Sequence, residues 1–397
     1  MFRIVHLTSV HPVFDPRIFY KECKTLVKVG YDVTLIAPYY ADDKVVFDND
    51  EGIIDNNELI NGDNKTTIID GIKIVWLPKP HNRFFRIFFL TRIVYRLALK
   101  QKADIYHFHD PELLPWMWLL KKKTGAKIIY DVHEDLPKDI LIKEWIPGIV
   151  RHFIVNIVKQ FEKFASRKFD FIVTATPDIS KNFKLPNVVD IKNYPVLDDF
   201  KIFKDPIFPK NKDHYNLIYI GVLDRNRGIK EIINSLNFIN PQYNIKLTLI
   251  GRFFDKDFKE EIKKLEKSAK VNFLGWLFPK DAYKYLLESD IGMVCLHPLE
   301  QFSTSLPVKM FEYMAAGLPV IASNFSLWKE IIEANKCGIC VNPLEPRDIA
   351  RAIEYLIENP KTAKEMEENG KKAILEKYNW EEESKKLIKT YQRLLNE

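Results

Sequence analysis

Residues 302–319 read Phe302-Ser303-Thr304-Ser305-Leu306-Pro307-Val308-Lys309-Met310-Phe311-Glu312-Tyr313-Met314-Ala315-Ala316-Gly317-Leu318-Pro319. Hydroxyl side chains stand at the start of this stretch, and proline suits the first turn of a helix because its missing N–H would have no intrahelical acceptor. The pattern predicts a helix over Pro307–Ala316, ended by Gly317 and Pro319. The apolar run Val320–Ser323 then predicts a buried strand, which completes one helix–strand step of a parallel sheet.

The same alternation of short apolar runs and amphipathic stretches extends over both halves of the chain. Further strands are expected at Ile4–Thr8, Asp32–Ala37, Lys73–Leu77, Asp104–His109, Lys127–Val132, Phe171–Thr174, Leu217–Ile220, Lys246–Ile250, Val271–Leu274 and Ile291–Cys295. Helices are expected at Phe19–Val29, closed by Gly30, and from about Ile229. This pattern predicts an α/β fold of doubly wound parallel sheets, with ligands bound at the carboxyl ends of the strands.

The length of 397 residues favours two domains, because a chain of this length exceeds one ordinary core. The proline-containing stretch Tyr194–Lys212 is the expected linker. We place an N-terminal Rossmann-like domain at residues 1–195 and a C-terminal one at 196–377. The charged amphipathic helix 378–397 is expected to pack back on the first domain. The polar stretch Ala41–Lys65 is expected to form a long loop.

The composition, 46% hydrophobic and 29% charged, is that of a globular protein. A net charge of +6 suits anionic substrates or an anionic membrane surface, and is too small to argue for nucleic-acid binding. Neither a signal peptide nor a run long enough to span a bilayer is evident. The four scattered cysteines do not form a disulfide framework. We therefore expect a cytoplasmic location.

Two sets of residues have the chemistry of metal ligands, but neither predicts a metal site. Cys337 and Cys340 form a C-x-x-C pair without further ligands at matching spacing. Gly338 is expected to end a helix there, with Cys340 in the next strand. His107 and His109 point to the same side of a predicted strand, but hydrogen-bonded histidines in a cleft are more common than metal ligands. No metal or other cofactor is expected.

Glycine spacing argues against both a dinucleotide dehydrogenase and a P-loop enzyme. No two glycines are closer than Gly221 and Gly228, so neither G-x-G-x-x-G nor the P-loop spacing occurs. A phosphate group would therefore be bound by a helix N-terminus and by cationic side chains.

The helix at 307–316 offers both features. Backbone N–H groups near Ser305 and Leu306 would face a diphosphate, and Lys309 lies one turn into the helix. Glu312 follows on nearly the same face, placed to accept hydrogen bonds from ribose hydroxyls. An ordinary capped helix with a solvated Glu312 accounts for the same residues, so the pattern alone leaves both interpretations open.

Residues from Pro307 to Ile321 resemble the donor-site helix of glycosyltransferase family 4, which contains retaining enzymes of the GT-B fold. Other motifs resemble the same family in order and spacing: Leu7-Thr8-Ser9-Val10-His11-Pro12 with Asp15 and Arg17, Asp104-Ile105-Tyr106-His107-Phe108-His109-Asp110, Tyr130-Asp131-Val132-His133-Glu134, Gly221-Val222-Leu223 with Arg227-Gly228, and Tyr378-Asn379-Trp380. The resemblance covers nearly the whole chain outside Ala41–Lys65. It implies two facing Rossmann-like domains with a cleft between them.

The resemblance also implies roles for individual residues. Glu312 matches the second glutamate of the family's E-x7-E motif, which holds the nucleotide ribose. Arg227 matches the basic residue that meets the donor diphosphate, where Lys309 would support it. His133 matches the histidine of the N-terminal domain that reaches the donor sugar near the reacting carbon. The expected catalytic residues are therefore His133, Glu312 and Arg227.

The remaining site residues follow from the same resemblance. The turn Ser9–Arg17 matches a loop that approaches the acceptor. The residues expected on the acceptor side are His11, Asp15, Arg17 and His109. The residues expected to bind the donor are Arg225, Arg227, Thr304, Ser305, Leu306, Lys309 and Glu312.

Two positions depart from the family pattern. The first glutamate of E-x7-E falls at Thr304, so the usual carboxylate contact to the donor sugar is missing or replaced by a hydroxyl. Val222 stands where a basic residue often follows Gly221, and Arg225 is close enough in sequence to compensate. The nucleotide half of the site is therefore better supported than the sugar half.

The resemblance implies transfer of a sugar from a nucleotide diphosphate sugar, with UDP the first candidate nucleotide and GDP the second. The acceptor would be a glycan or a polyprenol-linked glycan of cell-surface polysaccharide synthesis, and the reaction would retain configuration without a required metal. Two alternatives remain: a hydrolysing nucleotide-sugar epimerase of the same architecture, and a non-catalytic nucleotide-sugar-binding subunit. Glu312, Arg227 and His133 are all present, which argues against a decayed site.

Residues 83–102 suggest peripheral contact with a membrane. The run Arg83-Phe84-Phe85-Arg86-Ile87-Phe88-Phe89-Leu90 leads into Arg92, Arg96 and Lys100, which recur at helical spacing. A basic, aromatic helix suits the anionic inner face of a cell membrane, where a lipid-linked acceptor would lie. A core-packing helix with snorkelling arginines is the alternative.

Overall fold

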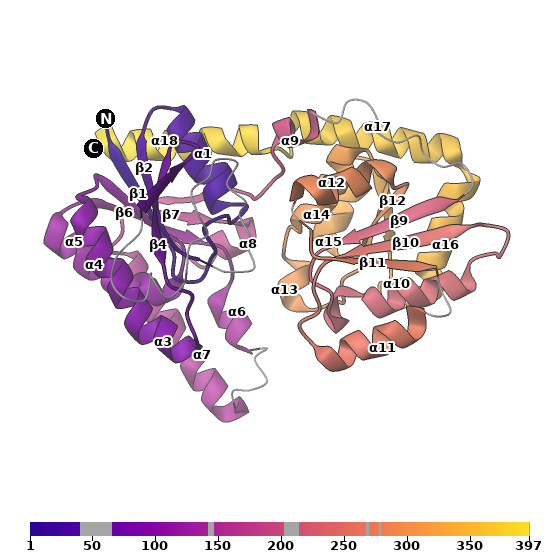
Figure 1. Cartoon of the computed structure of the whole chain (residues 1–397), viewed down its shortest axis with the longest axis horizontal. Helices are drawn as coiled ribbons and strands as arrows, with labels where there is room; N and C mark the ends of the chain where they lie inside the picture. The colour runs from indigo at the N-terminus through magenta and orange to yellow at the C-terminus, as the bar shows by residue number, and fades with distance from the viewer. Residues whose placement is uncertain (40–65, 142–146, 202–213, 267–269, 278, 397) are drawn as a thin grey trace. The chain divides into compact units, whose positions relative to one another are not determined.

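The computed structural model describes residues 1–39, 66–141, 147–201, 214–266, 270–277 and 279–396. These residues form two compact units (Figure 1). Unit 1 contains Met1–Lys192 together with the chain from Glu383 onward, and unit 2 contains Asn193–Glu382. Each unit has its own sheet and its own hydrophobic core.

Unit 1 is built on a sheet of eight described strands in the order β3-β4-β2-β1-β5-β6-β7-β8. The strands are β1 Arg3–Leu7, β2 Asp32–Pro38, β3 Thr66–Ile69, β4 Ile72–Leu77, β5 Ile105–Phe108, β6 Lys127–Val132, β7 Phe171–Thr174 and β8 Val188–Asp190. The described pairings are parallel except for the antiparallel pair of β3 and β4. The mainly apolar strands β1, β5 and β6 form the middle of this sheet, buried on both faces.

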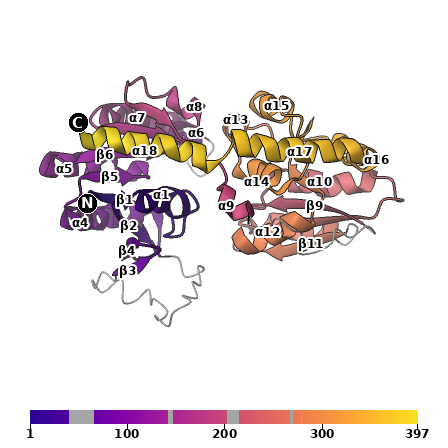
Figure 2. The same ribbon diagram turned by 90° about the horizontal axis from the view of Figure 1, so that it is seen from above.

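Helices cover both faces of the sheet in unit 1. Its helical segments are η1 Ile18–Cys23, α1 Lys24–Lys28, α3 Arg83–Phe85, η2 Arg86–Leu90, α4 Thr91–Gln101, η3 Pro111–Leu113, α5 Leu114–Thr124, α6 Leu136–Leu141, α7 Gly148–Ser166, α8 Pro177–Ser180 and most of α18 Trp380–Asn396. The apolar faces of α4 and α5, with the end of α7, form one core with the sheet. Segment η1 and helix α18 contribute side chains to the opposite face, and Figure 2 shows α18 running along unit 1.

Unit 2 is built on a sheet of six described parallel strands in the order β11-β10-β9-β12-β13-β14. The strands are β9 Tyr215–Ile220, β10 Ile245–Ile250, β11 Val271–Gly275, β12 Ile291–Val294, β13 Val320–Ser323 and β14 Gly338–Val341. The helical segments are α9 Leu197–Lys201, η4 Arg225–Arg227, α10 Ile229–Ser235, η5 Leu236–Phe238, α11 Lys256–Glu266, α12 Pro279–Glu288, α13 Glu300–Ser303, α14 Val308–Ala316, α15 Ser326–Ile332, α16 Pro346–Glu358 and α17 Pro360–Glu376. Helices α10, α11 and α16 pack into one core, while α12, α14 and α15 pack into another.

The predicted α/β class and doubly wound parallel sheets are confirmed. Strands β6, β7 and β13 have the predicted bounds, and the other predicted strands agree with the structure to within one or two residues at each end. The predicted loop at Ala41–Lys65 lies outside the described residues, as does the later part of the stretch Tyr194–Lys212. Its earlier part contains α9. The antiparallel edge strand β3 was not predicted.

The prediction that Gly338 ends a helix is wrong. Helix α15 ends at Ile332, and the left-handed residue before the next strand is Lys336, with φ 49°. Gly338 instead begins β14, where an added Cβ would lie 2.0 Å from the carbonyl oxygen of Val320. Close strand packing therefore explains this glycine. Cys340 lies in β14, as predicted.

Candidate active site

The donor-side residues of unit 2 gather where β9 ends. Gly221 follows the strand with φ 138°, and an added Cβ would lie 2.6 Å from Lys309 Nζ. Lys309 comes from the first turn of α14, where the N–H of Met310 donates to the carbonyl of Pro307 at 3.0 Å. A side chain at position 221 would therefore collide with a cation that lies against the backbone turn.

The ammonium group of Lys309 is buried without a matching anion in hydrogen-bond contact. Among the described residues, no acceptor hydrogen-bonds to Nζ, which lies 3.7 Å from the ring centroid of Tyr219. Burial and the nearby charge of Arg227 hold the pKa of Lys309 well below its usual range, against the opposing charges of Glu312 and Asp224. A buried cation without a hydrogen-bonded acceptor is unfavourable, so an anionic ligand in contact with Nζ would stabilise the charged form of Lys309.

Arg227 and Glu312 lie near this ammonium group. Arg227 comes from η4, forms a 3.2 Å ion pair with Asp224 and lies 5.6 Å from the ring centroid of Phe302. Glu312 lies nearly one turn beyond Lys309 in α14, and its Oε1 accepts a 3.0 Å hydrogen bond from the hydroxyl of Tyr283. The structure therefore brings together a cationic pair and a carboxylate, three of the residues expected to bind the donor.

The hydroxyl residues before α14 form hydrogen bonds to nearby backbone carbonyls, instead of facing a ligand as we predicted. The N–H of Ser305 donates to the carbonyl of Phe302 at 3.1 Å, so it is not the free donor that we expected. The hydroxyl of Thr304 donates to the carbonyl of Glu300 at 3.1 Å. Leu306 lies between this turn and Pro307, which precedes the first helical residue of α14. The helix N-terminus therefore starts later than the pattern predicted.

Arg225 is directed elsewhere. Its guanidinium group pairs with Glu261 at 2.5 Å and with Asp255 at 3.5 Å, and it lies over the ring of Phe258. Glu261 and Phe258 belong to α11. The described structure therefore does not bring Arg225 to the turn at Gly221, where it would compensate for Val222.

In unit 1, the predicted histidines lie at the carboxyl edge of the sheet. His109 follows β5 and His133 follows β6. His133 Nε2 lies 3.1 Å from Asp131 Oδ2 and 3.2 Å from His109 Nδ1. The side chain of His133 is 15% exposed and that of His109 is fully buried. His133 can therefore meet a ligand while Asp131 holds its ring.

His11 and Asp15 lie in the loop after β1 and form a partly exposed pair. His11 Nδ1 is 3.0 Å from Asp15 Oδ2, and the His11 and His133 rings lie 4.9 Å apart between centroids. Burial alone lowers the pKa of His11, but the hydrogen bond to Asp15 and the charge of Asp110 outweigh it and raise that pKa to about 9. This pair therefore presents a protonated imidazole at neutral pH.

Arg17 lies in the interior of unit 1, beneath these groups. Its Nε and Nη2 donate to the two oxygens of Asp131 at 3.1 and 3.0 Å, and Nη1 donates to the carbonyl of Ile191 at 2.8 Å. Nε also lies 3.0 Å from Glu22 Oε1, an ion pair that lacks hydrogen-bond alignment. Burial opposes ionisation of Asp131, but Arg17 and His133 hold its pKa well below the usual range. Arg17 therefore holds Asp131, which in turn is the hydrogen-bond partner of His133.

Three further residues complete this buried network and were missed in the sequence. His6 Nδ1 lies 3.0 Å from His109 Nε2, and Glu22 lies beside Arg17. The hydroxyl of Tyr391, from α18, lies 2.6 Å from His107 Nδ1 and 3.2 Å from His6 Nε2. We expected the final helix to pack on the first domain, which placed Tyr391 in that region of the fold. The sequence did not show that Tyr391 itself contacts the histidines.

Four of these residues have the chemistry of metal ligands. Ligand atoms of Glu22, His107, His109 and Asp131 lie within 4.8 Å of one another, all buried. The guanidinium group of Arg17 already lies 3.0 Å from both carboxylates. A positive charge at this distance opposes a second cation, so the arrangement favours a hydrogen-bonded network.

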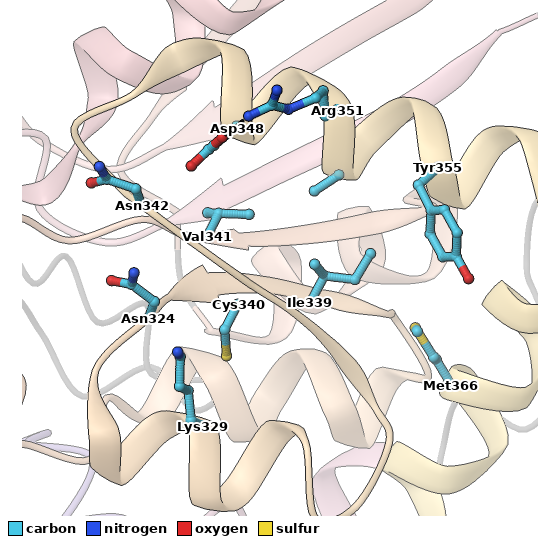
Figure 3. A pocket seen from close by; sticks show the side chains of 11 residues that line it. Asn324, Lys329, Ile339, Cys340, Val341, Asn342, Asp348, Arg351, Tyr355 and Met366 are labelled. Atoms are coloured by element: carbon cyan, nitrogen blue, oxygen red, sulfur yellow. Dashed lines mark hydrogen bonds and ion pairs between the residues drawn. The ribbon is translucent and has the colours of Figure 1, made fainter.

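A separate hollow in unit 2 lies at the end strand β14 (Figure 3). Its polar lining comes from Asn324, Lys329, Asn342, Asp348 and Arg351, with Cys340 on the strand. None of the residues expected to bind the donor lines it. We therefore do not include it in the candidate active site.

Comparisons with known proteins agree with this geometry. Residues 200–373 match the model for glycosyl transferases group 1, and residues 17–186 match that for glycosyltransferase family 4. Two uncharacterised glycosyltransferases of Methanocaldococcus jannaschii are similar: one is 29% identical over 180 residues, 45% of each chain. The other is 28% identical over 254 residues, 60% of this chain and 62% of the relative. The alignments thus span about half to three-fifths of these relatives.

The fold is also found among solved structures. HepE of Anabaena, solved in complex with UDP and glucose, has a TM-score of 0.69 at 13% identity, and the match covers 99% of this chain and 100% of that one. The two parallel-sheet units therefore have the GT-B fold. The chain belongs to glycosyltransferase family 4, group 1, a family of transferase enzymes. No helix in the described ranges has the length and apolar character needed to cross a membrane.

Proposed function

We propose that this chain transfers a sugar from a nucleotide diphosphate sugar to a hydroxyl of a glycan or lipid-linked glycan, with retention of configuration. UDP is the first candidate nucleotide and GDP the second. The observation that carries this proposal is the buried Lys309 ammonium at the Gly221 turn, without a hydrogen-bond acceptor among the described residues and close to Arg227. The UDP bound to the similar HepE structure supports the choice of nucleotide.

Each group has a physical task in this reaction. Lys309, Arg227 and the first-turn N–H groups of α14 stabilise the charge that develops on the departing diphosphate. Glu312 accepts hydrogen bonds from the ribose hydroxyls. His133, held by Asp131, contacts the donor sugar near the reacting carbon. These groups supply positive charge from the chain itself, so the proposed step does not require a metal.

We propose that transfer to the acceptor takes place at the cytoplasmic face of the cell membrane, as a step of cell-surface polysaccharide synthesis. Two features of residues 83–102 support membrane contact. Phe84, Phe88 and Phe89 are exposed large apolar side chains. Arg92 and Arg96 lie exposed one turn apart on α4, while its apolar residues pack into the core.

The first test is a thermal-shift screen with UDP, GDP, ADP and dTDP on the wild type, on Glu312→Ala and on Glu330→Ala. A ligand that binds only the folded state raises the melting temperature with its occupancy. We expect one nucleotide to stabilise the wild type and the Glu330→Ala control, which alters an exposed glutamate of α15. The stabilisation should be lost in Glu312→Ala.

Product analysis then separates the alternatives. Sugar transfer to an acceptor supports the proposal, whereas release of an epimerised sugar with free nucleotide would support the hydrolysing epimerase. Nucleotide binding without turnover over a panel of nucleotide sugars and acceptors would support a binding subunit. If none of the four nucleotides raises the melting temperature at millimolar concentration, the proposed donor site is wrong.

A further inference from the structure

A chain of hydrogen bonds runs through the buried polar groups of unit 1, and we name it the histidine relay. Its members, in order, are His133, His109, His6, Tyr391 and His107. The chain begins at the partly exposed ring of His133 and passes through the interior to the buried Tyr391 on helix α18. Its last member returns to the carboxylate that holds the first, since His107 Nε2 lies 3.7 Å from Asp131 Oδ2.

The proton of His133 is fixed by Asp131. Burial opposes ionisation of Asp131, but the charge of Arg17 holds its pKa well below the usual range, so this carboxylate only accepts hydrogen bonds. His133 Nε2 lies 3.1 Å from Asp131 Oδ2 and must therefore carry a proton. His109 Nδ1 lies 3.2 Å from the same nitrogen of His133. Two N–H groups do not face each other at this distance, so His109 Nδ1 carries no proton.

The other protons follow one by one, because the three inner histidines are neutral. Burial lowers the pKa of His6, His107 and His109 below the usual range, against the opposing charge of Asp131. A neutral imidazole has one N–H, so His109 carries its proton on Nε2 and donates to His6 Nδ1 at 3.0 Å. His6 then carries its proton on Nε2 and donates to the Tyr391 hydroxyl at 3.2 Å. Tyr391 in turn donates to His107 Nδ1 at 2.6 Å.

The last proton of the relay agrees with this direction. His107 is left with its proton on Nε2, and that N–H faces Asp131 Oδ2. In the opposite direction, His107 Nε2 would carry no proton, and its lone pair would repel the same carboxylate oxygen. His107 Nε2 is buried and has no hydrogen bond among the described residues, so the nearby charge of Asp131 decides which form is favoured. Asp131 therefore selects one direction at both ends of the relay.

We propose that the histidine relay fixes the neutral tautomer of His133 with its proton on Nε2, and that Tyr391 is the positioning residue that sets the direction. Nδ1 of His133 then faces the ligand, since no described residue forms a hydrogen bond with it. An imidazole nitrogen without a proton accepts a hydrogen bond, so it selects a hydroxyl group, here one of the donor sugar. The choice of ligand rests on the proposed function, whereas the direction of the relay is independent of it.

The first measurement is the tautomer of each histidine in the wild type, by nitrogen NMR at pH 8 of the full chain labelled in its histidine rings. Ring nitrogens with and without a proton resonate in well-separated regions of the spectrum. The signals are assigned by their loss in His133→Gln and in His109→Gln. We expect the proton of both rings on Nε2. A proton on Nδ1 of either ring would overturn the proposal, and this outcome does not depend on turnover.

Two variants alter the relay in different ways. Tyr391→Phe removes the acceptor of His6 Nε2–H, so the tautomers of His6 and His109 should become mixed. His107→Leu leaves the Tyr391 hydroxyl without its acceptor, so Tyr391 should donate to His6 Nε2 and move the proton of His6 to Nδ1. Unchanged tautomers in both variants would contradict the role of Tyr391.

The matched control is Tyr31→Phe. The Tyr31 ring lies 6.2 Å from that of Tyr391 between centroids. Its hydroxyl forms no hydrogen bond among the described residues. This variant removes a neighbouring hydroxyl outside the relay and should keep the wild-type tautomers. A change of tautomers in Tyr31→Phe as large as that in Tyr391→Phe would mean that packing, and not the relay, determines them.

Kinetics separate a positioning role from a structural one. In Tyr391→Phe, kcat/KM for the nucleotide sugar should fall by about three- to tenfold, the value of one hydrogen bond. The thermal shift caused by the free nucleotide should match the wild type, because the proposed nucleotide site lies in unit 2. A lower melting temperature with an unchanged kcat/KM would show that Tyr391 is only structural. If the wild type itself neither binds a nucleotide nor transfers a sugar, the proposed function fails, and the tautomers still decide the direction of the relay.

Discussion

The two units treat their buried cations in opposite ways. In unit 1, Arg17 is surrounded by acceptors: both oxygens of Asp131, the carbonyl of Ile191 and the nearby carboxylate of Glu22. In unit 2, Lys309 is buried over an aromatic ring without a hydrogen-bond acceptor among the described residues. The first arrangement is complete in the free protein. The second is incomplete, which is what an anion-binding site requires before its ligand arrives.

The largest effect is expected from Arg17→Met. The change leaves the Asp131 carboxylate buried without its cation, and breaking a buried ion pair from one side costs about 3–5 kcal/mol. Guanidinium unfolding should show this loss in the free energy of unfolding. Arg225→Met removes an exposed cation paired with Glu261 and should leave the unfolding curve unchanged. Equal losses for the two variants would contradict the structural role of Arg17.

Lys309→Met should separate stability from binding. The neutral side chain removes a buried charge, so the free energy of unfolding without nucleotide should stay the same or increase. Affinity for UDP, measured by isothermal titration calorimetry, should fall by about 10–100-fold, the value of a lost charge-assisted hydrogen bond. Lys329→Met, in the hollow at β14, is the matched control.

The lowered pKa of Lys309 adds a second readout to the same experiment. A bound diphosphate favours the protonated ammonium, so binding at alkaline pH should take up protons. Calorimetry in buffers of different ionisation enthalpy measures this uptake. If the proton uptake on nucleotide binding is unchanged in Lys309→Met, another group takes up the proton. Lys309 would then not be the cation that awaits an anion, and the comparison with Arg17 would fail.

The smallest effect concerns Glu162, a buried carboxylate of unit 1 with a hydroxyl partner instead of a cation. Burial raises the pKa of Glu162 to about 7, with the charge of Asp135 adding to it and the hydrogen bond from Tyr130 opposing it. Between its unfolded pKa near 4.3 and pH 7, the unfolded chain releases the proton more readily than the folded one. The free energy of unfolding therefore falls as pH rises through this window and levels off above it.

Glu162→Gln should remove this cost while keeping an acceptor for Tyr130. We expect stabilisation of about 1–2 kcal/mol at pH 8 and a gain of less than about 1 kcal/mol at pH 4.5, where Glu162 is neutral in the folded state and only about half ionised in the unfolded chain. Melting temperatures at the two pH values measure the difference, with the exposed Glu330→Gln as control. A gain of equal size at both pH values would rule out an origin in the charge of Glu162.

The fold was predictable because it depends on local patterns. Strands such as Phe171–Thr174 are apolar runs with the length and borders of buried strands. Gly30, Gly221 and Gly251 all have positive φ values where an element ends. Gly338 was misassigned because local sequence does not distinguish a glycine that permits a turn from one that permits close contact with Val320. That contact joins two strands distant in sequence.

The site was predictable only where a motif is continuous. Lys309 and Glu312 share one helix, so their spacing carried information. Arg225 was expected near the donor because it is close in sequence to Arg227, but α11 supplies two partners that hold it elsewhere. Tyr391 reaches His107 across 284 positions, and no local pattern encodes such a pair. The catalytic and binding roles themselves stay predictions until they are measured.

The place of α18 has a consequence for how the protein is made. The residues from Glu383 onward belong to unit 1, although the whole of unit 2 precedes them in the chain. A ribosome builds the chain from the N-terminus, and domains generally fold as they emerge. Unit 2 can therefore fold before Tyr391 has been added to the chain and can contact His6 and His107 in unit 1. The first unit to be synthesised is thus the last to be completed, because it gains its full set of contacts only when the final helix has been made.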